Sequence, residues 1–275
     1  MRQKLLCAFS EKGLLNKNIA DEKLRRSVDK AIDNKEFKIF LQFINERQSG
    51  KICGAEVLSR WDNPERGMLT PAKYIEILRE SGSIGKHDYY IFENLCILLE
   101  SWENTVYRNL FLNCNFTRIS VSEKNFADKI EEISARHHFD HSKLVIEITE
   151  DSLTEDIKIA TYNISRCKEM GFKVAIDDIG SGFSSISDLS INDIDLVKVD
   201  REIVISGVNE KGFKLLSSLI SLAHNMGASV LCEGIETEEQ NEMILKTDCD
   251  FIQGFYYSRV LPYYEAMKFL NSKTQ

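Results

Sequence analysis

Short apolar runs rich in β-branched residues recur along the chain, bounded by turn residues and separated by stretches long enough for a helix. Eight runs fit buried strands: Phe37–Ile44, Ile52–Trp61, Asn109–Phe116, Leu144–Thr149, Lys173–Ile179, Leu196–Asp200, Ser229–Gly234 and Phe251–Tyr256. Segments of helical period precede or separate them: Glu22–Ile32, Asp88–Trp102, Glu123–Arg136, Thr154–Met170, Glu210–Met226 and Glu238–Leu245. Strands that alternate with helices favour a parallel sheet, and eight such units predict an α/β fold of the (β/α)8 TIM-like barrel type.

The connection between the first two strands is too short for a parallel crossover. Seven polar, turn-prone residues separate Ile44 from Ile52. A crossover between parallel strands needs about a dozen residues or more. The first two strands are therefore expected to form a hairpin, which makes one strand of the barrel antiparallel to its neighbours.

The chain of 275 residues shows no composition shift, repeat or proline-rich linker that would mark an internal domain boundary. Its hydrophobic fraction of 43% can fill a sizeable core and excludes a disordered chain. We expect residues 1–20 to be an N-terminal extension, residues 21–265 to form the barrel, and residues 266–275 to be a C-terminal tail.

Two further features predict a cytoplasmic protein without a membrane span. No apolar run approaches the roughly 20 residues that cross a bilayer, and the patch Leu5–Phe9 is too short for a signal peptide. The seven cysteines are dispersed without a C-x-x-C pair, which is typical of reduced buried thiols rather than of disulfides or a zinc site.

The net charge is −8, from 43 acidic and 35 basic side chains. This balance argues against a binder of polymeric nucleic acid, which normally presents a basic face. It remains compatible with an acidic pocket that holds divalent cations.

Polar residues stand within or at the ends of strands that a parallel barrel should make almost wholly apolar. They are Glu56, Asn115, Glu147, Glu150, Asp177, Asp178, Lys198, Asp200, Glu233 and Gln253. Each alone has a structural explanation, such as a solvent-facing carboxylate, a turn, a snorkelling lysine or a satisfied core amide. Together they would meet at the active-site face of a barrel, where crowded carboxylates repel one another unless a cation is bound. Carboxylate and amide oxygens without histidine favour Mg²⁺ or Mn²⁺.

The segment from Asp177 to Ser185 combines a strand end, two acids and a glycine-rich loop. It lacks the spacing of a dinucleotide fold and the ending of a P-loop. It is either a flexible loop with a helix cap or a loop that lets a substrate approach metal-bridging acids, and both interpretations remain open.

In its motifs the sequence resembles the EAL-type cyclic di-GMP phosphodiesterase domain, from about Leu24 to Pro262. The motifs occur in family order: Glu56-Val57-Leu58-Ser59-Arg60-Trp61, Asn115-Phe116-Thr117, Glu147-Ile148-Thr149-Glu150, Asp177-Asp178-Ile179-Gly180-Ser181-Gly182-Phe183-Ser184-Ser185, Lys198-Val199-Asp200, Glu233-Gly234-Ile235-Glu236 and Gln253-Gly254. The family fold is a (β/α)8 barrel with one reversed strand, which agrees with the predicted hairpin.

The resemblance implies a role for each matching residue. Glu56, Asn115, Glu147 and Asp177 would hold one metal ion, and Asp177, Asp178 and Glu233 a second. Lys198 would position the attacking water, and Glu233 would be either the general base or a metal ligand. Residues that contact substrate would be Gln42, Arg60, Asp200 and Gln253, and supporting residues would be Glu150, Glu236, Gly180, Gly182 and Ser184. The implied reaction is hydrolysis of cyclic di-GMP to linear pGpG.

The chain departs from the family pattern at Val57, in Gln42-Phe43-Ile44 where a proline is absent, at Leu78-Arg79 and at Ile179. An alternative is therefore a catalytically weak domain that senses cyclic di-GMP or binds a regulatory protein partner. A third interpretation, an enolase-like barrel, is disfavoured by the glycine-rich loop. The resemblance also implies a homodimer near that loop, and the short N-terminal extension suggests that regulation comes from a partner, from oligomerisation or from expression level.

Overall fold

The structure is a computed structural model that describes residues 24, 27–149, 157–179 and 194–273. The chain divides into two compact units. The first comprises the described residues up to Lys38 together with Ser59–His87, and the second comprises Ile39–Leu58 and the described residues from Asp88 onward. No helix within these residues combines the length and apolar character needed to cross a bilayer.

Eight strands form a closed barrel. They are β1 (Phe37–Glu46), β2 (Ile52–Asn63), β4 (Phe111–Phe116), β5 (Leu144–Thr149), β6 (Lys173–Ile179), β7 (Leu196–Val199), β8 (Ser229–Cys232) and β9 (Phe251–Ile252). From β2 to β9 every neighbouring pair is parallel, and β1 closes the ring by pairing with β2 and, antiparallel, with β9. The predicted TIM-like barrel with a reversed strand in its first hairpin is confirmed.

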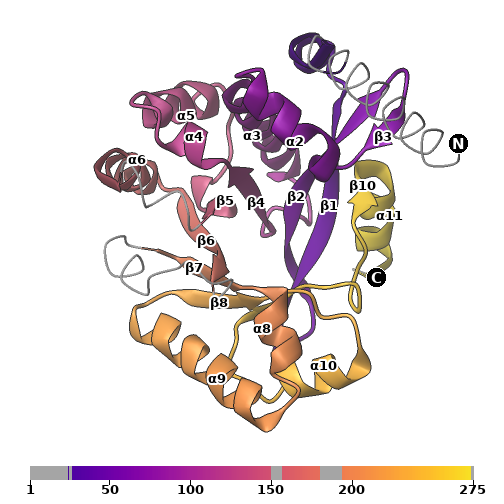
Figure 1. The fold of residues 1–275 in the computed structure, drawn as a ribbon, viewed down its shortest axis with the longest axis vertical. Coiled ribbons are helices and arrows are strands. Elements are labelled where there is room, and N and C mark those ends of the chain that lie inside the picture. The colour runs from indigo at the N-terminus through magenta and orange to yellow at the C-terminus, as the bar shows by residue number, and fades with distance from the viewer. Residues whose placement is uncertain (1–23, 25–26, 150–156, 180–193, 274–275) are drawn as a thin grey trace, which may run out of the picture. The chain divides into compact units, whose positions relative to one another are not determined.

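Helices alternate with most of the strands. They are α2 (Pro71–Glu80), α3 (Ile84–Trp102), α4 (Arg118–Val121), α5 (Phe126–Ser134), α6 (Ile157–Glu169), α8 (Arg201–Ser206), α9 (Glu210–Asn225), α10 (Glu238–Ile244) and α11 (Tyr263–Lys273), with a 3₁₀ turn η1 (His141–Lys143). Helix α6 packs on β6 and α9 on β8, as Figure 1 shows.

Several elements were not predicted from sequence: α2, α4, α8 and α11, and the short strands β3 (Gly67–Leu69) and β10 (Leu261–Pro262). Helices α4 and α8 span four and six residues, too few to show a helical period. Helix α11 runs into the segment expected to be a tail, and its Ala266 and Leu270 are buried. The domain boundaries at residues 20 and 265 stay predictions.

Three predicted strands end earlier than expected, because local backbone chemistry stops them. Asp200 is the N-cap of α8, where its carboxylate accepts a hydrogen bond from the Glu202 amide at 2.7 Å. Gly234 has a φ of 71°, a left-handed conformation that favours glycine. The last barrel strand pairs only as far as Ile252.

An apolar layer fills the barrel beneath its polar residues. Ile44, Val145, Ala175, Leu196 and Leu231 form one buried cluster with side chains from five strands. Three members of this cluster, Val145, Ala175 and Leu196, lie on β5, β6 and β7. The residues two positions after them are Glu147, Asp177 and Lys198. Alternate residues of a strand share a face, so the same inward face that carries the apolar layer carries the polar layer one step further along.

Candidate active site

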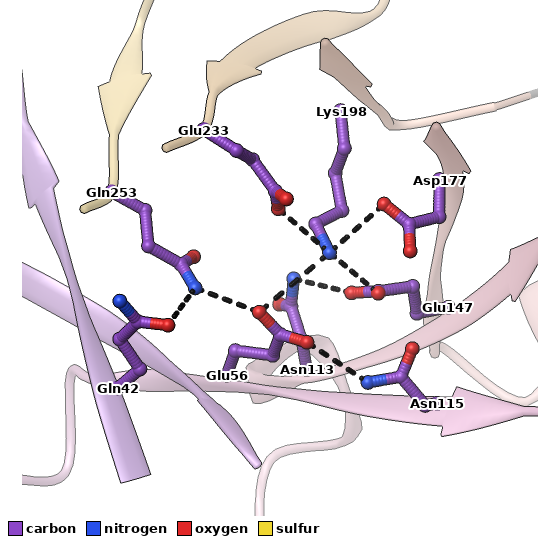
Figure 2. A network of polar contacts seen from close by, with 9 residues as sticks. All are labelled: Gln42, Glu56, Asn113, Asn115, Glu147, Asp177, Lys198, Glu233 and Gln253. Atoms are coloured by element: carbon purple, nitrogen blue, oxygen red, sulfur yellow. Dashed lines mark hydrogen bonds and ion pairs between the residues drawn. The ribbon is translucent and has the colours of Figure 1, made fainter. Parts of the chain in front are cut away.

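The polar layer gathers nine side chains from eight strands or the residues that directly follow them (Figure 2). They are Gln42, Glu56, Asn113, Asn115, Glu147, Asp177, Lys198, Glu233 and Gln253. Eight of them are residues that the sequence singled out for metal, water or substrate. All nine lie within the second unit.

Lys198 lies at the centre of the layer, with its side chain 1% exposed. Its ammonium nitrogen is 2.5 Å from Glu147 Oε1, 2.8 Å from Glu233 Oε1 and 3.1 Å from Asp177 Oδ1. Glu56 Oε2 lies further away, at 3.8 Å. Four carboxylates from four strands thus converge on one cation, as the dashed lines of Figure 2 show.

The charges of this cluster perturb one another. Burial by itself would lower the pKa of Lys198, but Glu147, Glu233, Glu56 and Asp177 together raise it well above its usual value. Burial raises the pKa of Glu147 well above its usual value, and it raises that of Glu233 to about 8. Lys198 therefore keeps its proton, and one ammonium faces more negative charge than it can neutralise.

Amide side chains hold Glu56 on both of its oxygens. Gln253 Nε2 donates to Glu56 Oε2 at 2.7 Å and also to Gln42 Oε1 at 3.1 Å. Asn115 Nδ2 donates to Glu56 Oε1 at 3.1 Å. Because Gln42 comes from the reversed strand β1, that strand helps to hold Gln253 and, through Gln253, the Glu56 carboxylate.

The donor chemistry fits a hard divalent cation. Within the described residues, no group of three or more His, Cys, Asp or Glu is arranged as a metal site, since the carboxylates converge on Lys198 instead. Two buried amide oxygens of the layer, Asn113 Oδ1 and Gln253 Oε1, have no hydrogen-bond partner. An excess of carboxylate charge together with open amide oxygens suits Mg²⁺ or Mn²⁺ and the water that such ions carry.

The remaining predicted site residues either make other contacts or are not described by the structure. Arg60 belongs to the first unit, where its Nη1 donates to the Ser59 carbonyl at 2.8 Å. Asp200 caps α8, and Glu236 forms an ion pair with Arg201 at 2.8 Å. Glu150, Gly180, Gly182, Ser184 and the side chain of Asp178 lie outside the described residues.

Asn113 was not among the predicted site residues. It lies on β4 two positions before Asn115, and Nδ2 of Asn113 donates to Glu147 Oε2 at 3.1 Å. The period-2 alternation of a strand places both asparagines on the inward face. That alternation is the sequence signal for Asn113, which lies inside the strand rather than at its end.

With this geometry established, comparison with known proteins identifies the family. The family model of the EAL domain matches residues 25–260, so the chain belongs to the EAL domain family. The uncharacterised protein Rv1354c of Mycobacterium tuberculosis is 31% identical over 227 residues, 82% of this chain and 36% of its own length. The cyclic di-GMP phosphodiesterase NbdA of Pseudomonas aeruginosa is 24% identical over 265 residues, 96% of this chain and 34% of its own.

A solved structure shows the same fold. The EAL enzyme Bd1971, in its cAMP- and cyclic-di-GMP-bound form, superimposes with a TM-score of 0.84 at 27% identity, covering 97% of this chain and 75% of that one. The chain spans about a third of the length of the two curated relatives.

Proposed function

We propose that this chain hydrolyses cyclic di-GMP to linear pGpG with the help of two divalent ions, Mg²⁺ or Mn²⁺. The observation that carries the proposal is the convergence of four carboxylates on Lys198 inside an EAL-family barrel. The names of two similar proteins support the choice of substrate. NbdA is called a cyclic di-GMP phosphodiesterase, and Bd1971 is described as an EAL enzyme in a cyclic-di-GMP-bound form.

The residues would share two ions. Glu56, Asn115, Glu147 and Asp177 would hold the first, and Asp177, Asp178 and Glu233 the second. When bound, such ions lower the pKa of a water molecule and neutralise charge that develops on a phosphoryl group.

The side chains themselves supply orientation and charge. The Lys198 ammonium, already held by three carboxylates within 3.1 Å, is placed to orient the attacking water and to balance negative charge. A water oxygen would bond to phosphorus, one phosphorus–oxygen bond to the sugar would break, and the proton would end on the released sugar hydroxyl. Glu233 is either the base that takes the proton from water or a metal ligand.

Substrate contacts belong to the same proposal. The planar guanidinium of Arg60 suits bidentate binding of a phosphate. Gln42, Gln253 and Asp200 would contact the nucleotide. Glu150, Glu236, Gly180, Gly182 and Ser184 would support the loop and the metal ligands.

Direct assay of the purified chain tests the function. Incubation with cyclic di-GMP and Mg²⁺ or Mn²⁺ should yield pGpG by liquid chromatography, and excess EDTA should stop the reaction. Tight binding of cyclic di-GMP without turnover would instead support the receptor alternative that the changes at Phe43, Arg79 and Ile179 suggest. Location in the cytoplasm, a homodimer and a regulatory protein partner remain part of the proposal, and light scattering tests the dimer.

A further inference from the structure

Asn113 occupies an unusual position in the polar layer. Its side chain is fully buried on β4. Nδ2 donates to Glu147 Oε2 at 3.1 Å, while the other oxygen of that carboxylate contacts Lys198 at 2.5 Å. Asn113 Oδ1 has no hydrogen-bond partner. Figure 2 shows Asn113 in the middle of the layer, between Glu56 and Glu147.

The orientation of this amide follows from the chemistry of its neighbour. In the structure the NH₂ group of Asn113 donates to a carboxylate oxygen of Glu147, and the carbonyl oxygen therefore points elsewhere. A buried carbonyl without a partner costs free energy. Leucine has a similar size and would fill the same space without that cost.

A second amide shows the same arrangement. Gln253 donates from Nε2 to Glu56, and its Oε1 is likewise buried without a partner. Two amides therefore each give their NH₂ group to a carboxylate and leave an acceptor oxygen open. These two amide oxygens, next to an excess of carboxylate charge, can accept hydrogen bonds from a bound molecule. A water molecule that is coordinated to a divalent ion is such a donor.

We propose that Asn113 is a positioning residue of the metal site that orients the Glu147 carboxylate through Nδ2 and presents Oδ1 to the water shell of the bound ion. This inference rests on the proposed function, because it requires that the site binds a divalent ion. Residues that orient metal ligands commonly change metal affinity by about 10–100-fold when they are replaced.

Asn163 provides a matched control. It is a fully buried asparagine in α6 whose Nδ2 donates to the carbonyls of Val121 and Glu123, and its Oδ1 also lacks a partner. Both of these hydrogen bonds go to backbone carbonyls and none to a carboxylate of the polar layer. Replacement of Asn163 thus reports the effect of losing a buried amide on folding, separately from any effect on metal binding.

The experiment measures the affinity of Mn²⁺ alone and Mg²⁺ alone by titration calorimetry, for the whole chain and for the Asn113→Leu and Asn163→Leu variants. We expect Asn113→Leu to weaken metal binding at least about tenfold, and Asn163→Leu to bind within twofold of the unmodified chain. Equal metal affinity of Asn113→Leu and the unmodified chain would overturn the inference.

Two controls keep the result interpretable. Circular dichroism in EDTA checks that each variant is folded, and Asn113→Ser, which introduces a smaller side chain, replaces Asn113→Leu if leucine is not accommodated. If the unmodified chain binds neither ion, the metal part of the proposed function fails. If the unmodified chain binds a metal ion and the Asn113 variants bind it equally tightly, only the inference about Asn113 fails.

Discussion

At the scale of single residues, the main feature of the site is its concentration of buried charged groups. Four carboxylates lie around the ammonium of Lys198, whose side chain is 1% exposed. Burial raises the pKa of Glu147 and Glu233, because a charged carboxylate loses hydration there. The neighbouring carboxylates raise the pKa of these two residues further, whereas Lys198 favours their ionised form.

Replacement of Glu56 by alanine tests the metal assignment. Glu56 is held on both oxygens by amides and belongs to the proposed first metal site. We expect Glu56→Ala to lower cyclic di-GMP turnover by more than about 100-fold, measured by chromatography of the product. Glu210→Ala, at an ion-paired glutamate that is 84% exposed, is the control and should retain full activity. Near-normal turnover by Glu56→Ala would refute the assignment.

Lys198 is expected to stabilise the metal-free protein. Its replacement by methionine keeps a long unbranched side chain but leaves the carboxylates without a cation. Removal of one partner of a buried ion pair costs about 3–5 kcal/mol, so Lys198→Met should lose that much free energy of unfolding in EDTA, measured with urea. Added Mn²⁺ should restore part of it, because the ion replaces the missing positive charge. An unchanged urea midpoint in EDTA would argue against this role.

At the scale of elements, the barrel orders its polar side chains by anchoring the segments that follow the strands. Asp88 in α3 is buried, and its Oδ2 accepts hydrogen bonds from the Thr117 amide at 3.0 Å, the Thr117 hydroxyl at 2.8 Å and the Ser120 hydroxyl at 2.7 Å. Thr117 comes two residues after Asn115, so one carboxylate of a helix secures the end of β4.

Loss of that anchor should destabilise the fold. Asp88→Ala removes the acceptor of three donors, one on buried Ser120 and two on half-buried Thr117, and we expect a loss of about 2–4 kcal/mol in the free energy of unfolding. Urea unfolding followed by circular dichroism measures it. Asp33→Ala, which breaks a largely exposed ion pair with Lys86, serves as the comparison and should change stability by less than about 1 kcal/mol. Similar losses in the two variants would contradict the anchoring role.

Helix caps provide a second local contribution. Thr237 and Gln240 form a capping box at the start of α10, and Asn209 caps α9 by accepting a hydrogen bond from Gly212 at 2.9 Å. Such caps fix the residue at which each helix begins. They explain why the predicted starts of α9 and α10, at Glu210 and Glu238, are correct to the residue.

At the scale of the whole molecule, thiol burial sets a pH dependence. Burial raises the pKa of Cys53, Cys96 and Cys167 from 9.0 to about 12. At pH 8 these thiols are protonated in the folded state, so iodoacetamide should label them far more slowly than in guanidinium, as mass spectrometry can follow. Equal labelling rates with and without guanidinium would contradict their burial.

The same shift acts on stability. Above pH 9 the unfolded chain releases these protons while the folded chain retains them until about pH 12, so stability should fall as the pH rises through that interval.

Much of the architecture follows from the sequence alone. The alternation of apolar runs with helical segments places all eight barrel strands, and the seven residues before Ile52 require the reversed hairpin. Most site residues also follow, because a carboxylate, amide or lysine in a strand that should be apolar stands out locally. These features depend on spacing along the chain, and spacing is a property of the sequence.

Only the tertiary structure decided how the polar residues meet. Gln42 and Gln253 are 211 positions apart, and their hydrogen bond exists because the reversed strand β1 closes the barrel against β9. The central position of Lys198 and the contact of Asn113 with Glu147 depend likewise on which strands are neighbours and in what register. Chain periodicity specifies the face of a strand on which a side chain lies. Closure of the barrel specifies which other side chains lie opposite that side chain.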